Sequence, residues 1–587
     1  MADIRFSTLI NGSTVAFNPS TDRIIFEQEA VDVDFAYQTE TSLTIHVFGK
    51  DVTFTGSLKD IVGGPMGNFI TANGSVWIVG DNDLSISDPA PATTDDGPNI
   101  IRGGSQGDFL MGLGGNDTIY GGAGRDAIRG GTGNNYLNGG DGDDSAQYSG
   151  SALFVDLARN IVSRPNGEVD QIYGIEQIWT QASYSRVNGA YDDTMLGDDA
   201  NNYFSTYAGN DLLEGRGGDD TFRAGIGRDT IHGGDGFDEL AYHDNGALEG
   251  ITIDLGSGSG TIMDPWGDLD TFTSIEAARG TKFDDTITGS DDANRFRGFA
   301  GDDVIDGRGG HDWIDYSLEA NNHSNQTGRD GGVTVNLQTG LATDPFGNTD
   351  RLISIEGATG TGDADTIIGG HDTNFRLEGL GGNDVIMGLA GADTINGGTG
   401  NDWLDGGDGR DTAIFSGERS SYAVSTSAAN TVVAGGDGTD TLAGIERLQF
   451  SDGTLAFDIT GKDGNAGTIY RLYQAAFDRK PDAPGLGYWI KEFDQGQKDL
   501  AGVAYDFLIS DEFEATYGSP ETVSDEAFLN LLYRNVLGRD ADGPGKAYWL
   551  EQMANGFARE RVLASFSESE ENQKLVAADI KDGIWYI

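Results

Sequence analysis

The stretch GGAGRDAIRGGTGNNYLNGGDGDD, residues 121–144, decides the fold. A glycine pair recurs in it every nine residues, and an acidic or amide residue stands five places after the first glycine of each pair. With Gly121 as position 1 the register is G-G-x-G-x-D-x-U-x, where U is a large apolar residue. The glycines permit tight turns, and x-U-x is long enough for one short strand with its apolar side chain inward. One such turn can bury nothing alone, so the stretch predicts a stack of turns with an apolar seam at position 8.

The same register defines four blocks, at 94–147, 188–241, 280–315 and 360–414, with one extra residue near Arg376 in the last. They hold six, six, four and six turns, and position 8 is apolar almost throughout, with Arg376 the clearest exception. Position 6 is Asn in five turns, namely Asn99, Asn135, Asn202, Asn294 and Asn374. In the other seventeen it is aspartate: Asp108, Asp117, Asp126, Asp144, Asp193, Asp211, Asp220, Asp229, Asp238, Asp285, Asp303, Asp312, Asp365, Asp384, Asp393, Asp402 and Asp411.

The rest of the chain separates into three kinds of segment. Alternating apolar and polar residues predict a small β domain over 1–83, and the Pro- and Asp-rich residues 84–93 are a linker. The blocks are joined and followed by related spacers, each ending in D-x-Φ-x-x-I-E (Φ, large apolar) after a β-like stretch. The spacers span 148–187, 242–279, 316–359 and 415–461, and their motifs are DQIYGIE at 170–176, DTFTSIE at 270–276, DRLISIE at 350–356 and DTLAGIE at 440–446.

Helical periodicity begins after the last spacer, so 462–587 is predicted to be an α-helical domain. It is duplicated, because residues 479–489 and 539–549 share R-x-x-D-x-P-G-x-x-Y-W. The shared Arg479/Arg539, Asp482/Asp542, Gly485/Gly545 and Trp489/Trp549 could form a ligand surface, but a loop cap and core residues explain them more simply. The predicted fold class is therefore mainly β, with the repeat blocks in the middle and helices at the end.

The charge of the chain points to a cation as its partner. Of its 587 residues, 95 are acidic and only 37 are Lys or Arg, giving a formal net charge of −58. Nucleic acid and anionic membranes would be repelled. There is no cysteine, which excludes disulfides and thiolate zinc sites, and no apolar run of 18 residues predicts a transmembrane helix. The start, MADIRFSTLI, lacks the basic and apolar regions of a cleaved signal peptide.

Calcium suits the repeat better than other divalent ions. It accepts six to eight hard oxygen ligands at about 2.3–2.6 Å in forgiving geometry, and the turns offer carbonyl and carboxylate oxygens. Magnesium demands a stricter octahedron and keeps its waters. We therefore expect the seventeen aspartates to hold several calcium ions between successive turns, with no other cofactor.

These nonapeptides closely resemble those of the RTX (repeats-in-toxin) family, which form calcium-filled parallel β-rolls. The resemblance covers about 94–414. It implies export, unfolded, through the type I secretion machinery of a Gram-negative bacterium, with an uncleaved C-terminal signal for which KDGIWYI at 581–587 is the candidate. An ordinary apolar last strand or helix end would also explain that segment. The duplicated tail resembles a domain of unknown function found in RTX and surface-layer-like proteins, and more distantly the linker polypeptides of phycobilisomes.

Some turns depart from the family's pattern. Gln106 replaces the glycine at position 4 of its turn, and Leu113 replaces the glycine at position 2 of its turn. These turns are expected to bind calcium weakly or to act as caps. Asn at position 6 is expected to mark starting turns with weak or no calcium. Asn135 would be the weak turn inside a block, keeping an oxygen ligand but losing a charge.

No catalytic residues are predicted. None of the six histidines lies in H-E-x-x-H, and GGSQG at 103–107 matches the nucleophile elbow only inside a nonapeptide. The expected function is a secreted calcium-binding protein, not an enzyme, with a structural, adhesive or matrix role outside the cell or on its surface. Cell-surface or matrix polysaccharide is a candidate partner. The alternatives are an extracellular enzyme, such as one active on polysaccharide, that uses the blocks for secretion and folding, and a surface-layer component.

Overall fold

The structure is a computed structural model that describes residues 97–587 apart from 182–190, 244–246, 257–258, 318–330, 371–374, 428–429, 461–463 and 520. For 1–96 it gives strand bounds only, so the predicted β domain and linker otherwise lie outside the described residues. The strands there form the sheets β1-β3-β7 and β2-β6-β5-β4, while β8 pairs with a strand of the first block. Their bounds are β1 (Ala2–Arg5), β2 (Ser13–Ala16), β3 (Asp22–Ile25), β4 (Asp34–Thr39), β5 (Ser42–Val47), β6 (Lys50–Thr55), β7 (Phe69–Ile70) and β8 (Trp77–Val79).

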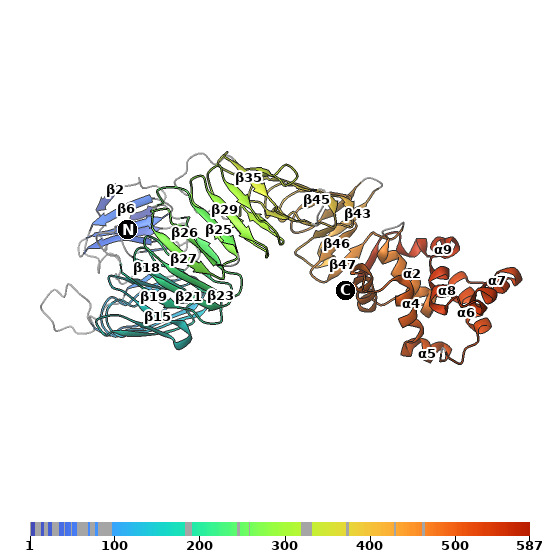
Figure 1. Cartoon of the computed structure of the whole chain (residues 1–587). Coiled ribbons are helices and arrows are strands. Elements are labelled where there is room, and N and C mark those ends of the chain that lie inside the picture. The colour runs from blue at the N-terminus through green and yellow to red at the C-terminus, as the bar shows by residue number, and fades with distance from the viewer. Residues whose placement is uncertain are drawn as a thin grey trace. The chain divides into compact units, whose positions relative to one another are not determined.

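The chain divides into two compact units. Unit 1 comprises residues 1–330 and 340–355, and unit 2 comprises 331–339 and 356–587. Figure 1 shows the many short strands of the blocks and, at the red end of the chain, the helices.

In unit 1 the nonapeptides build two parallel sheets, called sheet I and sheet II here. Consecutive turns supply strands to the two sheets alternately, so each strand pairs with the strand 18 residues further on, as Ile119 does with Leu137 and Leu110 with Ile128. Sheet I contains β9 (Ile100–Arg102), β11 (Thr118–Ala123), β13 (Tyr136–Asp141), β15 (Phe154–Asp156), β16 (Ile161–Ser163), β17 (Val169–Tyr173), β19 (Thr194–Leu196), β21 (Leu212–Gly217), β23 (Thr230–Asp235), β25 (Thr252–Gly256), β26 (Ser259–Met263), β27 (Leu269–Thr273), β29 (Thr286–Ser290), β31 (Val304–Asp306), β34 (Leu341–Thr343) and β35 (Thr349–Ile353). Sheet II contains β10 (Phe109–Met111), β12 (Ala127–Arg129), β14 (Ser145–Ser149), β18 (Gln177–Gln181), β20 (Tyr203–Ser205), β22 (Thr221–Arg223), β24 (Glu239–Ala241), β28 (Ala277–Arg279), β30 (Arg295–Arg297) and β32 (Trp313–Asp315). One coil of the stack is therefore two nonapeptides.

The apolar seam at position 8 is the core of the coil. Leu110, Ile119, Ile128 and Leu137 are all 0% exposed. Because side chains alternate along a strand, the single inward position of each three-residue strand falls on the large apolar residue. The predicted stack of turns around an apolar seam is confirmed.

Each spacer inserts an antiparallel excursion into sheet I. After the first block, β17 pairs in parallel with β13, β16 and β15 follow antiparallel, and β15 pairs in parallel with β19. Sheet II gains only β18, between β14 and β20. The second spacer repeats this arrangement with β27, β26 and β25 in sheet I and β28 in sheet II. The β-like stretches predicted before each motif are thus strands of the same sheet as the repeats. A short 3-10 helix, η3 (Leu157–Arg159), lies within the first spacer.

Unit 2 contains the fourth block in the same arrangement. One sheet is formed by β33 (Thr334–Asn336), β37 (Thr366–Gly370), β39 (Val385–Gly391), β41 (Trp403–Gly409), β45 (Thr439–Ala443), β44 (Thr431–Ala434) and β43 (Ala423–Thr426). The other is formed by β36 (Gly357–Thr359), β38 (Arg376–Glu378), β40 (Thr394–Asn396), β42 (Thr412–Ile414), β46 (Arg447–Phe450), β47 (Gly453–Ala456) and β48 (Ile584–Tyr586), and η4 (Arg419–Ser421) precedes β43.

The extra residue of this block lies earlier than the sequence register assumed. Leu377, not Arg376, pairs with Ile395 and is 0% exposed, so it occupies position 8. The backbone N–H of Phe375 donates to Oδ1 of Asp393, the bond that position 6 makes elsewhere. Phe375 therefore makes the position-6 bond in this turn, and Asn374, to which the sequence register assigned position 6, lies outside the described residues.

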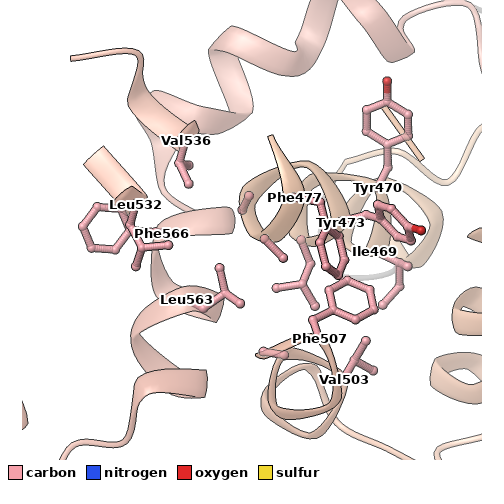
Figure 2. Packing of buried hydrophobic residues seen from close by; sticks show 14 of the residues in the cluster. Ile469, Tyr470, Tyr473, Phe477, Val503, Phe507, Leu532, Val536, Leu563 and Phe566 are labelled. Atoms are coloured by element: carbon pink, nitrogen blue, oxygen red, sulfur yellow. The ribbon is translucent and has the colours of Figure 1, made fainter. Parts of the chain in front are cut away.

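The C-terminal domain consists of two successive sets of four helices of similar length. They are α2 (Asn465–Phe477), α3 (Ala483–Asp494), α4 (Leu500–Leu508), α5 (Asp511–Tyr517), α6 (Asp525–Leu537), α7 (Gly543–Ala554), α8 (Arg559–Ser567) and α9 (Glu570–Ile580). Their apolar faces meet in one core, seen in Figure 2, where Phe477 and Phe507 lie near the middle. No helix in the described part of the chain has the length and apolar character needed to cross a bilayer.

The residues shared by the two helical repeats cap and pack the domain. Asp482 and Asp542 are the N-caps of α3 and α7, each accepting from the N–H of the glycine three residues on. Arg479 pairs with Glu512, and Arg539 pairs with Glu571. The last segment leaves the helices, because β48 pairs with β47. The predicted fold class, mainly β with a helical C-terminal domain, is confirmed.

Candidate metal centre

The position-6 side chains form two columns, one along each edge of the coil. Inside a block, one side-chain oxygen of a position-6 residue typically accepts a hydrogen bond from the backbone N–H of the residue 18 positions earlier. Asp126 Oδ1 lies 2.7 Å from Asp108 N, and Asp144 Oδ1 lies 2.7 Å from Asp126 N. On the other edge Asn135 Oδ1 lies 2.9 Å from Asp117 N. The nine-residue register alone does not show which of these residues share an edge. The structure shows it, because one coil is 18 residues long.

The second carboxylate oxygen of many of these residues is buried and has no hydrogen-bond partner. All seventeen predicted aspartates are described, and none is more than 4% exposed. A buried anionic oxygen without a donor is costly unless a cation meets it. Buried Oδ2 atoms of this kind belong to Asp126, Asp144, Asp220, Asp229, Asp238, Asp303, Asp384, Asp393, Asp402 and Asp411.

The glycine at position 1 leaves open the place toward which these oxygens point. A Cβ on Gly121 would lie 2.2 Å from Asp126 Oδ2 and 2.3 Å from the carbonyl oxygen of Gly139, one coil further on. We call this place, where a carboxylate and a carbonyl oxygen converge beside a position-1 glycine, the oxygen cradle. It recurs at Gly215 with Asp220, and at Gly379 with Asp384. Two oxygens from adjacent coils beside an open space fit a hard cation such as calcium.

The metal ligands cannot be side chains alone. Across the described residues, no group of three or more His, Asp or Glu side chains could hold a metal ion. The remaining ligands would be backbone carbonyls of the glycine turns, which are common calcium ligands.

Without a cation the columns resist ionisation. Burial raises the pKa of Asp126 to about 7, and the neighbouring carboxylates of Asp144 and Asp108 contribute to the rise. The same cause raises the pKa of Asp220, Asp384 and Asp411 to about 7. A cation between these carboxylates would therefore stabilise their ionised form.

We call each residue of a column a rung. The rungs at the start of a column are capped by hydrogen bonds within their own turn. Oδ2 of Asp108 accepts from Gly104 N, that of Asp285 from Thr281 N and that of Asp365 from Thr361 N, at 2.5–2.6 Å. In Asn202 and Asn294 it is Oδ1 that accepts from the corresponding N–H. Local caps of this kind satisfy an oxygen that interior rungs leave unpaired.

Asn135 differs from the aspartates above and below it. Its Oδ1 is used in the column, and a Cβ on Gly130 would lie 2.7 Å from its Nδ2. An amide donor thus occupies the cradle. The amide oxygen of Asn135 bonds within the column, and the weak calcium binding expected of this turn stays a prediction.

Replacing the second glycine does not change the turn. Leu113 has φ 72°, and Arg216, Phe299, Leu380 and Leu389 have φ between 66° and 77° at the same position. The coil imposes the left-handed conformation on these residues, at a conformational free-energy cost of about 1–2 kcal/mol for each.

One edge of the second block lacks the glycine of the cradle. Thr206 and Ala224 stand at position 1 in the turns of Asp211 and Asp229, where other turns have glycine. Burial, with the charges of Asp270 and Asp211, raises the pKa of Asp229 to about 10. In the absence of a cation this carboxyl therefore favours its protonated form.

The spacers continue both columns, which the sequence had not revealed. Asp170 Oδ1 accepts from Asn135 N at 2.8 Å, and Glu176 Oε2 accepts from Asp144 N at 2.8 Å. The second spacer repeats this with Asp270 and Glu276, and the fourth with Asp440 and Glu446. The D and E of the D-x-Φ-x-x-I-E motif are therefore rungs of the two edges. The recurrence of this Asp and Glu in all four spacers was the sequence signal that could have identified them as column residues.

Three of the four spacer aspartates have their second oxygen bonded by a neighbouring side chain. Tyr242 Oη donates to Asp270 Oδ2 at 3.1 Å, and Tyr316 Oη donates to Asp350 Oδ2 at 2.8 Å. In the first spacer Arg164 also pairs with Asp170 Oδ2 at 2.6 Å. These carboxylates have both oxygens engaged.

Comparison with known proteins finds two families within the chain. The model of the RTX calcium-binding nonapeptide repeat matches residues 93–128, 120–146, 188–222, 205–240, 279–314 and 378–413. The model of a domain of unknown function, DUF4214, matches 504–576. The search of curated proteins finds no match to this sequence. Among solved structures, the extracellular lipase LipA of Serratia marcescens aligns over 47% of this chain and 42% of its own length, at 17% identity and a TM-score of 0.15.

Proposed function

We propose that this chain, which carries RTX calcium-binding nonapeptide repeats, is a secreted calcium-binding protein whose blocks fold when calcium fills the cradles. The observation that carries the proposal is the recurring buried Oδ2 beside a position-1 glycine and a carbonyl of the next coil. A calcium titration of the full chain by isothermal calorimetry tests it. Several ions should bind in the range of extracellular modules, about 10⁻⁴–10⁻³ M, and magnesium should not compete. A chain that binds no calcium would contradict the proposal.

The same chemistry would keep the chain exportable. RTX repeat proteins are typically secreted by type I systems of Gram-negative bacteria. In a cytosol poor in calcium the carboxylate columns repel one another, and outside the cell the ion supplies the missing charge. Binding would then also be the folding step.

A structural or adhesive role fits the described architecture better than catalysis. Ser105, the serine of the elbow-like GGSQG, lies exposed between the short strands β9 and β10, not at the end of a buried strand before a helix. Screening the calcium-loaded protein against polysaccharides, esters and proteins tests this role. Turnover of any of them would favour the alternative of an extracellular enzyme.

Two aspartates of the second block should differ in calcium binding. Asp220 lies beside Gly215 and has an open cradle, whereas Asp229 has Ala224 at the matching position. Asp220→Asn is expected to remove one ion per chain, because an amide replaces the free oxygen. Asp229→Asn is expected to leave the ion count unchanged, because the amide resembles the protonated acid. Native mass spectrometry counts the ions, and equal counts for the two variants would contradict the assignment.

Acid should partly replace calcium. The folded carboxyls have pKa values near 7, as for Asp126 and Asp220, against an ordinary 3.8. For acids with raised pKa the stability of the calcium-free fold is largest below 3.8 and is lost as pH rises through about 7. In chelator, the β signal in circular dichroism is therefore expected to increase from pH 8 to pH 5.5. The range stops above the isoelectric point of 4.1 to avoid precipitation. A signal that falls over this range would contradict the expectation.

A further inference from the structure

The last turn of a block faces the spacer, and the spacer rebuilds the oxygen cradle there. A Cβ on Gly139 would lie 2.3 Å from Asp144 Oδ2 and 2.0 Å from the carbonyl oxygen of Gly174. Within a block the corresponding carbonyl belongs to a position-1 glycine, as Gly139 does for Gly121. The spacer residue thus supplies the same oxygen at the same place.

The arrangement recurs at the other block ends. A Cβ on Gly233 would lie 2.4 Å from Asp238 Oδ2 and 1.9 Å from Ser274 O. At the end of the fourth block, a Cβ on Gly406 would lie 2.5 Å from Asp411 Oδ2 and 2.4 Å from Gly444 O. The residues to which these carbonyl groups belong share one left-handed conformation, with φ of 55° at Gly174, 55° at Ser274 and 57° at Gly444.

The aspartates at these ends need a positive partner. Asp144, Asp238 and Asp411 are each 0% exposed, and the Oδ2 of each is buried without a hydrogen-bond partner. That oxygen points into the cradle and not toward solvent. The spacer therefore does not cap the block with a donor on this edge.

A glutamate two residues after the carbonyl takes the place of the position-6 aspartate. In the repeat, the glycine and its Asp are five positions apart, whereas Gly174 and Glu176 are two positions apart. The longer side chain spans the shorter loop, because Glu176 Oε2 reaches Asp144 N at 2.8 Å, as an aspartate Oδ1 does elsewhere. Glu276 and Glu446 reach Asp238 N and Asp411 N at 2.9 Å.

The rung that follows the glutamate carries no charge. Asn202 follows Glu176 on this edge, since Tyr203 N donates to Glu176 O, and Asn294 follows Glu276 with its Nδ2 donating to Glu276 O. On the opposite edge, the aspartates of the first two spacers are already bonded by Arg164 and Tyr242. The edge with the glutamates is thus the one that stays open to a cation at the block end.

We infer that each of these block ends holds one additional calcium ion, bound by the last aspartate, the spacer glutamate and the spacer carbonyl. The sites are Asp144 with Glu176, Asp238 with Glu276, and Asp411 with Glu446. This inference rests on the proposed function, because it extends the calcium columns into segments that lack the nonapeptide. It makes the spacer motif part of the metal-binding sequence.

The test is an ion count on the full chain with variants of one spacer. Glu446→Gln keeps the size of the side chain and is expected to remove one calcium ion per chain in native mass spectrometry over a calcium series. Glu418→Gln, an exposed glutamate in the same spacer, makes the same charge change and is expected to remove none. Unchanged counts for Glu446→Gln, with circular dichroism like that of the wild type, would overturn the inference.

A second variant keeps the charge and changes the reach. Glu446→Asp is expected to weaken this one site about tenfold, because the shorter side chain cannot span the two-residue loop. Equal affinity in Glu446→Asp and wild type would overturn the role of the longer side chain. If the wild-type protein bound no calcium, the proposed function itself would fail, and the two outcomes are therefore distinguishable.

Discussion

Removing calcium from the full-length protein is expected to abolish amide protection in the four blocks while leaving it intact in the helical domain. The blocks bury carboxyls whose pKa values are raised to about 7 or above, and each pKa unit corresponds to about 1.4 kcal/mol. Carboxyls such as Asp126, ionised at pH 8 against a pKa of about 7, each cost about 4 kcal/mol, so a few of them are comparable with the 5–15 kcal/mol that stabilises an ordinary domain. Calcium removes this cost by providing the counter-charge.

The helical domain is the internal control for that experiment. Its core is formed by apolar side chains such as Ile469, Leu472 and Phe507, all at most 2% exposed, and its exposed charges pair on the surface. Hydrogen exchange at pH 8 in chelator, read by mass spectrometry, should show fast exchange over the blocks and slow exchange over α2, α4 and α8. Adding magnesium should not restore the blocks. Protection that persists in the blocks without calcium would show that their fold does not need the ion.

Deleting one nonapeptide is expected to do more damage than deleting two. One coil is two turns, since β11 pairs with β13 and β10 pairs with β12. Removing 121–129 would place two consecutive turns in the same sheet, so the next apolar residues would lie in the wrong sheet. Each large apolar side chain that loses its buried place costs about 1.5–3 kcal/mol. Removing 121–138 deletes a whole coil and keeps the alternation.

Thermal unfolding in saturating calcium distinguishes the two deletions. Because 1 kcal/mol shifts the midpoint by about 2–4 °C in a domain of 150–250 residues, the nine-residue deletion should lower it by about 10 °C or more. The eighteen-residue deletion should lower it by only a few degrees, although it removes more residues and more ligands. A midpoint that simply falls with the number of residues removed would contradict the eighteen-residue coil.

The sequence predicts what is local in this fold. The position of each turn, the apolar seam and the acidic edge all follow from nine residues, because glycine, one aspartate and one apolar residue have separate structural roles in each turn. The duplication of the helical domain was equally visible, and Asp482 and Asp542 prove to be its helix caps.

The sequence could not reveal what depends on partners far along the chain. Asn135 and Asp170 are 35 residues apart, and Asp229 and Asp270 are 41 apart, yet both pairs are consecutive rungs. The register of the fourth block was misplaced for the same reason, because only the long-range bond from Phe375 to Asp393 locates the extra residue. Ala224 and Thr206 are conspicuous only when the cradle around position 1 is known.

The spacers also impose a geometry on the coil within unit 1. Between β13 and β19 sheet I has three additional strands, whereas between β14 and β20 sheet II has one. With strands about 4.8 Å apart, one side of the stack is longer by roughly 10 Å at such a junction. The two spacers that lie wholly in unit 1 therefore act as wedges, because each lengthens one sheet relative to the other at its junction.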